Sequence, residues 1–454
     1  MINRYHDWAA ALLRLTPTRI MVLSFILLIL LCTAILMHPA CYTSNTTPNF
    51  IDVVFMSTSA VCITGLTTLD VATDFTRLGQ CVILFFIQIG GLGMVTFTSS
   101  LLVLFGAKLG LGHRKMLQEY LPGIEMSSIL RVTKYVVLVF FVVELLGALI
   151  LSLVWVPIYG WGDGLFHALF HSVASLCNAG ISTIPNGLIT YRSNVLINFT
   201  VMAMVIVGGL GYVVIIEFVK FFVGKDRASM HHRLHIRIVL MTSLILTIIG
   251  AIGIFLFENS NPELNSNSLG TAIMAALFQS VTCRSCGYST VDISSFEPYT
   301  KQFMMGLMFI GGATGSTASG IKVTTFALLI MATWAQIKGK RDIEIEGRRI
   351  PWTRVAHATS LTIIAFFTVI AVIVILNYLE PNIDYADLVF DAVSALGTVG
   401  LSTGVPSRCG VLAKLLFCVC MFIGRLGPFT VALSLISQPN PQHTTYPEGN
   451  ILIG

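Results

Sequence analysis

The sequence predicts an all-α integral membrane protein built from four tandem repeats, in which two spanning helices flank a half-length segment. Three observations support this prediction: the apolar composition, a series of long apolar runs, and two short signatures that recur four times. The 454 residues are 55% hydrophobic and 11% charged, with a mean hydropathy of +0.84. Soluble domains carry about 25% charged residues, so a soluble globular domain is excluded.

Long apolar runs define eight expected spanning helices, since one crossing of the hydrocarbon core takes about 20 apolar residues. The first run has basic flanks but no small-residue cleavage site after it, so we expect a spanning helix and not a removed signal peptide. The runs cover residues 20–37, 79–105, 134–157, 195–223, 236–257, 302–337, 355–378 and 411–437.

Most of the 27 Lys and Arg residues cluster in alternate loops: the N-terminus, 108–134, 220–237 and 338–354. The positive-inside tendency assigns these loops and both termini to the cytoplasm of a multi-pass protein in the cell membrane. Because topology accounts for the net charge of +5, no nucleic-acid partner is expected. The basic residues expected on the outside are Arg77, Arg192, Arg284, Lys301, Arg408 and Lys414.

Four half-length segments share one pattern: each begins with Phe and ends in four residues that start with Gly. The second of these four is apolar or Tyr, the third is Ser or Thr, and the fourth is Thr. They read FMSTSAVCITGLTT, FHSVASLCNAGIST, FQSVTCRSCGYST and FDAVSALGTVGLST; Phe precedes Gly by ten residues except in the third copy, where it precedes by nine. We expect the third loop to differ locally for that reason. The repeats divide the chain into domains 1–106, 107–224, 225–340 and 341–454.

Each segment is too short to span a membrane, so it must dip in and return as a pore loop. Four such loops around one axis predict a central ion pathway, because backbone carbonyls can replace the water shell of a cation. The residues that we expect to bind the ion in this filter are Ile63, Thr64, Gly65, Asn178, Ala179, Gly180, Ser285, Cys286, Gly287, Thr398, Val399 and Gly400. The alternative is that the glycines serve only for helix packing.

The short helix before each loop would point its partly negative C-terminal end at the axis, which favours a cation there. Expected caps at the opposite ends are Asp52, Asp163, Asp384, and Ser266 or Ser268.

A second signature follows each loop: IGGLG at 89–93, VGGLG at 207–211, IGGATG at 310–315 and IGRLG at 423–427. We interpret its glycines as packing or hinge positions within the second spanning helices, not as ion contacts. The fourth copy replaces one glycine with Arg425. A mid-span arginine must face protein or water, so we expect a barrier in the pathway; snorkelling, or an ion pair with Glu144 or Glu217, is the alternative.

The third copy is interrupted by GGATGSTASGIK at 311–322, which is poor in helix-forming residues. The stretch is not a phosphate loop, because Ile321 separates Gly320 from Lys322. A broken helix beside a pathway predicts a gate, and a static kink is the alternative. The expected gate residues are Gly311, Gly312, Gly315, Ser316, Ser319, Gly320, Lys322 and Arg425.

These loops, together with GGATGSTASGIK and FIGRLGPFT, resemble the Trk/Ktr/HKT superfamily of potassium transporters, and most closely its KtrB-type translocating subunits. The resemblance implies K+ as the transported ion at Gly65, Gly180, Gly287 and Gly400, with no organic cofactor. It also implies a homodimer with one pathway per protomer, regulated by a separate cytoplasmic ring of nucleotide-binding RCK subunits. Glycine at position 65, where some relatives carry serine and favour sodium, implies a preference for potassium.

Other interpretations are weaker. No GxSxG or HExxH motif supports a membrane enzyme, and His167 and His171 share a helical face without acidic partners. Cys283 and Cys286 form a single CxxC, too little for a zinc or redox site, and we expect no structural disulfides among the ten cysteines. A secondary transporter with alternating access would have inverted repeats, whereas these four are parallel. Coupling to sodium stays open.

Overall fold

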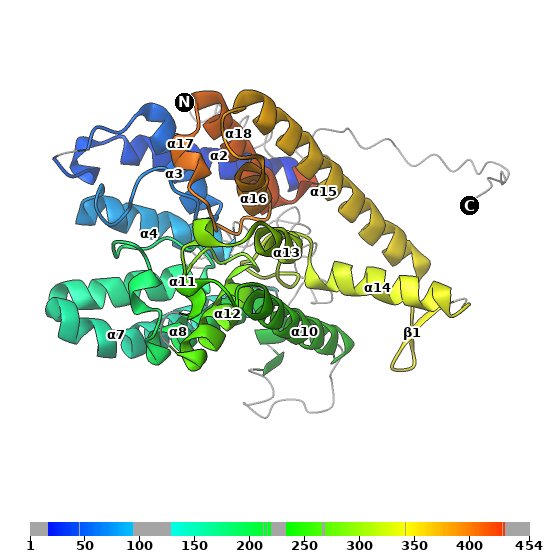
Figure 1. Cartoon of the computed structure of the whole chain (residues 1–454). Coiled ribbons are helices and arrows are strands. Elements are labelled where there is room, and N and C mark those ends of the chain that lie inside the picture. The colour runs from blue at the N-terminus through cyan, green and yellow to red at the C-terminus, as the bar shows by residue number, and fades with distance from the viewer. Residues whose placement is uncertain are drawn as a thin grey trace, which may run out of the picture.

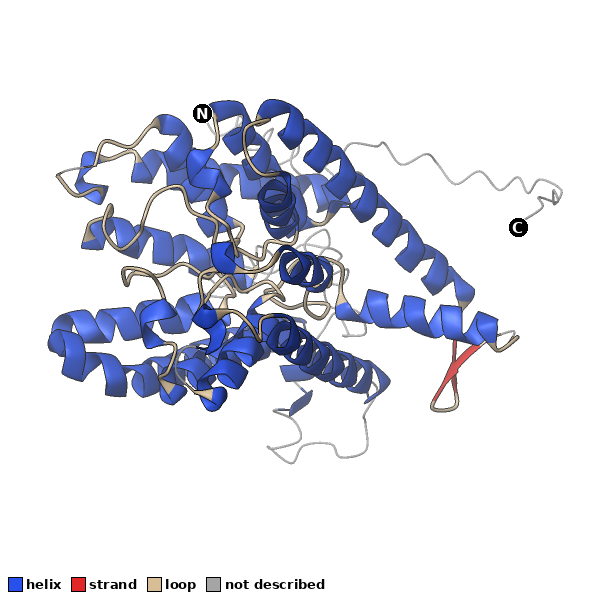
Figure 2. Ribbon diagram, in the orientation of Figure 1, coloured by secondary structure: helices blue, strands red, loops and turns tan. Residues whose placement is uncertain are grey.

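The computed structural model describes residues 17–44, 46–93, 129–211, 213–215, 217–218, 233–265, 268–340, 342–428 and 430–431. The described chain is mostly helical, as predicted, and its strands form one small hairpin (Figure 2). Both ends of the chain lie outside the described residues, so the predicted side of the termini stays a prediction.

The elements of the four predicted repeats are arranged around a common centre, where their loops meet (Figure 1). The first repeat comprises α2 (Pro17–Leu36), η1 (Pro39–Cys41), α3 (Phe50–Val61) and α4 (Arg77–Leu92). The second comprises α7 (Ile129–Leu176), η2 (Ile189–Tyr191) and α8 (Val195–Leu210). Gly160, at φ 82°, separates the long first part of α7 from the half-length helix that ends at Leu176.

The third and fourth repeats complete the ring. The third comprises α10 (Arg233–Phe257), α11 (Pro262–Asn265), α12 (Leu269–Thr282), η3 (Ile293–Ser295), α13 (Pro298–Phe309) and α14 (Val323–Ile337). A hairpin of β1 (Ile343–Ile345) and β2 (Arg348–Ile350) follows, with Ile343 paired to Ile350. The fourth repeat comprises α15 (Trp352–Leu379), α16 (Tyr385–Leu396), α17 (Val405–Arg408) and α18 (Val411–Leu426), and α18 packs against α3 of the first.

Four described helices are long and apolar enough to cross a membrane: Arg19–Leu36, Lys134–Leu176, Leu234–Phe257 and Trp352–Leu379. They expose large apolar side chains such as Leu27, Leu153 and Phe367, as a lipid-facing surface requires. The recurrent phenylalanines at the centre behave oppositely, because Phe55, Phe170, Phe278 and Phe390 are all buried. These phenylalanines anchor the half-length helices inside the protein.

The second helices of the repeats are shorter than the sequence indicates. α4, α8 and α18 stop at the last glycine of the second signature, where Gly93, Gly211 and Gly427 have φ of 72°, 81° and 84°. Glycine takes this left-handed conformation without the steric cost that a Cβ imposes. Our expectation that the glycines of this signature lie within the second spanning helices is therefore wrong for Gly93, Gly211 and Gly427. Residues 94–105 of the second expected span lie outside the described residues.

Two of the expected helix caps are also wrong. Asp384 accepts hydrogen bonds from the amides of Ala386 and Asp387, and Ser268 accepts one from Thr271, so both cap as predicted. Asp52 instead lies in the first turn of α3, which begins after Asn49. Asp52 pairs with Lys414 of the fourth repeat, and Asp163 pairs with Arg77 of the first. Ser266 lies outside the described residues.

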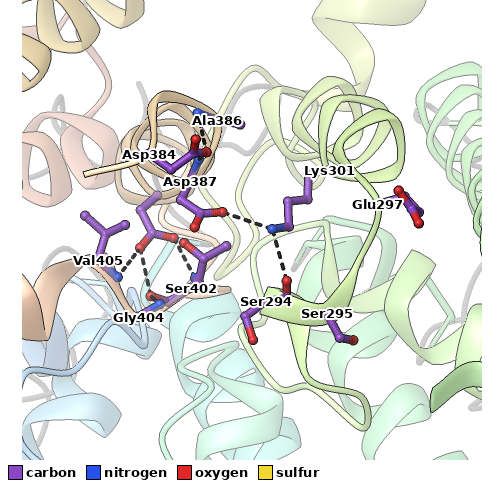
Figure 3. Close-up of polar contacts among 12 residues, drawn as sticks. Ser294, Ser295, Glu297, Lys301, Asp384, Ala386, Asp387, Ser402, Gly404 and Val405 are labelled. Carbon is purple, nitrogen blue, oxygen red and sulfur yellow. Dashed lines mark hydrogen bonds and ion pairs between the residues drawn. The ribbon is translucent and has the colours of Figure 1, made fainter. Parts of the chain in front are cut away.

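Basic side chains at the start of the second helices reach the start of the next half-length helix. Lys301 Nζ lies 2.9 Å from Asp387 Oδ1 and 3.2 Å from the carbonyl oxygen of Ser294 (Figure 3). Lys414 Nζ lies 2.7 Å from Asp52 Oδ1, and this pair joins the fourth repeat to the first. Four contacts of this kind join one repeat to the next: Arg77 to Asp163, Arg192 to the carbonyl of Leu264, Lys301 to Asp387, and Lys414 to Asp52.

Removal of one partner from the Lys414–Asp52 pair will destabilise the protein, because both side chains are largely buried. We expect Lys414→Met to cost about 3–5 kcal/mol, since it leaves a buried carboxylate uncompensated. Arg237→Met is the matched control, because the contact of Arg237 with Glu346 is exposed and should be worth less than about 1 kcal/mol. Unfolding in detergent micelles measures both, and equal midpoints for the two variants would contradict the expectation.

Candidate functional site

The four loop glycines form a closed ring in which each one faces the backbone of the next. A Cβ added to any of them would collide with the carbonyl oxygen just before the next glycine in the ring. The added Cβ would lie 2.5 Å from the Ala179 oxygen at Gly65, 2.3 Å from the Cys286 oxygen at Gly180, 2.8 Å from the Val399 oxygen at Gly287, and 2.1 Å from the Thr64 oxygen at Gly400. The last contact leads back to the first loop. Glycine at these positions is therefore required by space.

The backbone conformation repeats around this glycine ring as well. Gly65, Gly180, Gly287 and Gly400 have φ between 61° and 92°. The residue two positions earlier also has positive φ in every loop: Ile63 at 49°, Asn178 at 58°, Ser285 at 71° and Thr398 at 44°. Non-glycine residues adopt this conformation uncommonly, and four equivalent cases indicate a constraint from the surrounding structure. All twelve residues of the expected filter thus lie in these four loops around the ring.

The third loop differs from the others, as its shorter spacing predicts. In three loops the amide before the ring glycine donates to the carbonyl five residues earlier: Thr64 to Ser59, Ala179 to Ala174, and Val399 to Ser394. In the third loop Cys286 donates to Thr282, four residues earlier. The deletion is therefore absorbed between the half-length helix and the ring glycine, and the ring itself is kept.

The interrupting loop, residues 311–322, folds back on itself between α13 and α14. Its neck is closed by hydrogen bonds from the Gly311 amide to the Ile321 carbonyl and from the Val323 amide to the Gly312 carbonyl. Gly315 and Gly320 take φ of 76° and 72°, and Ser316 Oγ donates to the Ala313 carbonyl. The loop is therefore an ordered, internally bonded unit.

Contacts of the interrupting loop reach the second and third repeats. The amides of Ala313 and Thr317 donate to the carbonyls of Gly209 and Gly208, which lie in the last turn of α8 and lack partners within that helix. The Ser319 amide donates to Ser285 Oγ in the loop of the third repeat. Thus the loop lies directly beside the glycine ring and completes the broken end of α8.

Arg425 is bound to the interrupting loop. Its guanidinium donates to the carbonyl oxygens of Thr317 and of Gly90 in α4. Glu144, one of the acidic partners that the sequence suggested, instead accepts a hydrogen bond from Gln88 at 2.8 Å. Lys322 Nζ donates to the Ala318 carbonyl at 2.7 Å, so two cationic side chains are bonded to the backbone of one loop. The sequence placed both residues near the pathway but did not indicate these partners.

Three glycines of the second signature are close-packing positions, whereas a Cβ on Gly93 would meet nothing within 4 Å. A Cβ on Gly90, Gly208 or Gly424 would lie 2.1–2.2 Å from the last carbonyl of a half-length helix. Those carbonyls belong to Val61, Leu176 and Leu396. The second helices therefore press directly against the helix ends that point to the ring, which holds the loops in place.

Arg284 is a half-buried residue whose partners sequence reasoning did not predict. It lies at the end of α12 and donates to the Ser243 carbonyl and the Thr247 hydroxyl of α10. A cation beside the C-terminus of a helix is favoured by the helix dipole. Its position directly after Cys283, within the loop itself, was the available signal. All ten cysteines, Cys283 and Cys286 included, are free thiols.

The chain has relatives along nearly its full length. The family model described as TrkH, cation transport protein, matches residues 5–446. The Ktr system potassium uptake protein B of Bacillus subtilis is 35% identical, with 97% of each chain covered. The potassium/sodium uptake protein NtpJ of Enterococcus hirae is 33% identical, with 97% of this chain and 98% of that protein covered.

A solved structure shares the fold. The potassium transporter TrkH of Vibrio parahaemolyticus superposes with a TM-score of 0.69 at 19% identity, over 91% of this chain and 84% of that one. These relatives are transport proteins, which sets aside the membrane-enzyme interpretation. The chain belongs to the TrkH family of cation transport proteins.

Proposed function

We propose that this protein is the potassium-translocating subunit of a Ktr/Trk-type uptake system. The observation that carries the proposal is the closed ring of Gly65, Gly180, Gly287 and Gly400, in which backbone oxygens and not carboxylates gather at the centre. Among the described residues, no group of three or more His, Cys, Asp or Glu side chains could hold a metal ion. The relatives are named potassium uptake proteins, which supports the same ion.

In this proposal the loop carbonyls replace the water shell of K+ as it passes. Carbonyl dipoles coordinate a cation without a buried net charge, so the ion binds and leaves quickly. Positive φ at alternate residues of each loop lets successive carbonyls turn, and glycine allows the loops to approach. The buried hydroxyl of Thr64 and the amide of Asn178 have no hydrogen-bond partner among the described residues, which suits a space filled by water or an ion.

The interrupting loop acts as the gate in this proposal. Its supports are its place beside Ser285 and its contact with Arg425. Movement of the loop would release Gly208 and Gly209 of α8 and would displace the Arg425 guanidinium from the Thr317 carbonyl. A cationic side chain at that point raises the energy of a passing cation and limits flux.

Partners follow from the names of the relatives. Proteins called part of a Ktr system imply a second component, and we propose a cytoplasmic RCK ring that controls the gate. A homodimer in the cell membrane with cytoplasmic termini belongs to the same proposal. The hairpin of β1 and β2 offers charged residues, among them Arg348, Arg349 and Glu344, to such a partner.

Ion flux into vesicles tests the function directly. Purified protein in potassium-free proteoliposomes should admit potassium down its gradient without sodium. Because NtpJ is named a potassium/sodium uptake protein, obligatory coupling is the second candidate. Uptake that strictly requires a sodium gradient would establish coupling and remove the channel-like mechanism. Absence of potassium uptake in both conditions, with an RCK partner present, would contradict the proposed function.

Truncation of Arg425 should raise maximal potassium flux. Arg425→Ala removes the cation and its hydrogen bonds to Thr317 and Gly90, so we expect roughly a several-fold increase in flux with little change in ion preference. Arg408→Ala is a control, because Arg408 lies in α17 and, among the described residues, its hydrogen bonds go to the nearby carbonyls of Thr403 and Gly404. Flux equal to that of the unmodified protein, at equal protein amounts, would indicate a purely structural role for Arg425.

A methyl group in the glycine ring should abolish transport. Gly400→Ala places a Cβ 2.1 Å from the Thr64 carbonyl, at φ 89°, so we expect at least about a tenfold loss of potassium uptake. Gly306→Ala is the matched control, because nothing lies within 4 Å of a Cβ there. Rubidium uptake into vesicles measures both, and normal uptake by the Gly400 variant would contradict the filter assignment.

A further inference from the structure

A buried polar side chain follows the recurrent phenylalanine in three of the four loops. These residues are His171, Gln279 and Asp391, and each is fully buried. All three contact the serine two positions beyond the ring glycine: Ser182, Ser289 and Ser402. Three unlike side chains therefore make the same connection, from the half-length helix to the loop segment just beyond the ring.

Asp391 makes the most contacts of the three. Its Oδ2 accepts hydrogen bonds from the Ser402 hydroxyl at 2.9 Å and the Val405 amide at 3.1 Å, and its Oδ1 accepts one from the Thr403 amide at 3.0 Å. Ser402 in turn accepts from the Gly404 amide, and Ser402, Gly404 and Val405 lie together at this end of the loop (Figure 3). A buried carboxylate with three donors fixes several consecutive residues at once.

His171 and Gln279 reach one residue of the loop each. Nδ1 of His171 lies 2.8 Å from the His167 carbonyl and must donate there, so the Ser182 hydroxyl donates to Nε2 at 2.9 Å. Gln279 Nε2 donates to Ser289 Oγ at 2.6 Å. The hydroxyl oxygens of Ser182 and Ser289 also accept a hydrogen bond from the amide two residues later, that of Ile184 and that of Val291. The loop segment is thus shaped by the serine, and the serine is held by the helix.

The first loop lacks this connection. Met56 takes the place of the polar residue and Thr67 that of the serine. A thioether is a weak acceptor and no donor, so it cannot hold the loop in the same way. The four quarters of the ring are therefore fixed to different degrees, most firmly in the fourth.

We propose that Asp391 is a positioning residue that sets ion selectivity by holding the loop segment beyond Gly400, with His171 and Gln279 in the same role for their loops. Discrimination between potassium and sodium depends on the number and orientation of the carbonyl dipoles around the ion. Gly400 packs against the backbone of the first and third loops, so freedom in the segment after it changes the ring on both sides. The inference rests on the proposed potassium transport.

Asp391→Asn tests the proposal, because the amide nitrogen would face either the Thr403 amide or the donors from Ser402 and Val405. We expect the potassium-to-sodium uptake ratio in proteoliposomes to fall by roughly three- to tenfold, since hydrogen bonds to a charged group are among the stronger ones. Asp384→Asn is the matched control: it neutralises a carboxylate that caps the N-terminus of the same helix, away from the ring, and the ratio should not change.

Three further results decide the outcome. Met56→Leu, at the equivalent place of the first loop, should leave the ratio unchanged. If Asp391→Asn does not fold, Ser402→Ala removes one contact and should still lower the ratio. An unchanged ratio in Asp391→Asn, or in Ser402→Ala if Asp391→Asn does not fold, overturns the positioning role of Asp391. Selective uptake by the Asp384 control would still support the proposed potassium transport. Non-selective uptake by the unmodified protein and the control alike overturns both.

Discussion

The approach of four backbone segments at the centre, with no room for a side chain, is the constraint on which the rest of the structure depends. Each ring glycine lies against the carbonyl before the next, and a Cβ at any of them would come within 2.8 Å of an oxygen. Such an arrangement exposes peptide dipoles that no partner in the ring satisfies, so surrounding elements must hold it together. The buried phenylalanines, the helix ends pressed on by Gly90, Gly208 and Gly424, and the inter-repeat contacts all serve this purpose.

The interrupting loop shows how two broken helices complete one another. Helix α8 ends at Leu210 and leaves carbonyls of its last turn without intrahelical donors. The loop between α13 and α14 has free amides, and those of Ala313 and Thr317 bind Gly209 and Gly208. Because neither break is satisfied alone, a change in the conformation of one is transmitted to the other.

Much of the centre could be predicted from the sequence, because the chain repeats its chemistry. A glycine that recurs in four half-length segments marks a conformation that other residues rarely adopt, and the structure brings all four together. The missing residue in the third segment likewise had a local consequence, the changed bond of Cys286. Local patterns of this kind are visible because they depend only on neighbours along the chain.

Contacts between distant repeats were not predictable in the same way. The sequence suggested that Asp52 caps a helix, yet Asp52 binds Lys414, more than 300 residues away. Nothing in the sequence indicated that Arg284 would bind α10, yet its side chain donates to the Ser243 carbonyl of that helix. The breaks at Gly93, Gly211 and Gly427 were hidden because glycine in an apolar run is equally compatible with close packing. Each of these outcomes depends on which elements meet in space.

The pair of Lys414 and Asp52 differs from the contacts of Arg77, Arg192 and Lys301, because it joins the last repeat to the first. Successive repeats are joined by peptide bonds at three of the four junctions, whereas the fourth and first meet only through non-covalent contacts such as this pair and the packing of α18 on α3. The circle therefore has a single seam. Because the chain is made from its N-terminus onward, the glycine ring can close only after the fourth repeat has been synthesised, and separation along that seam opens the ring without breaking a covalent bond.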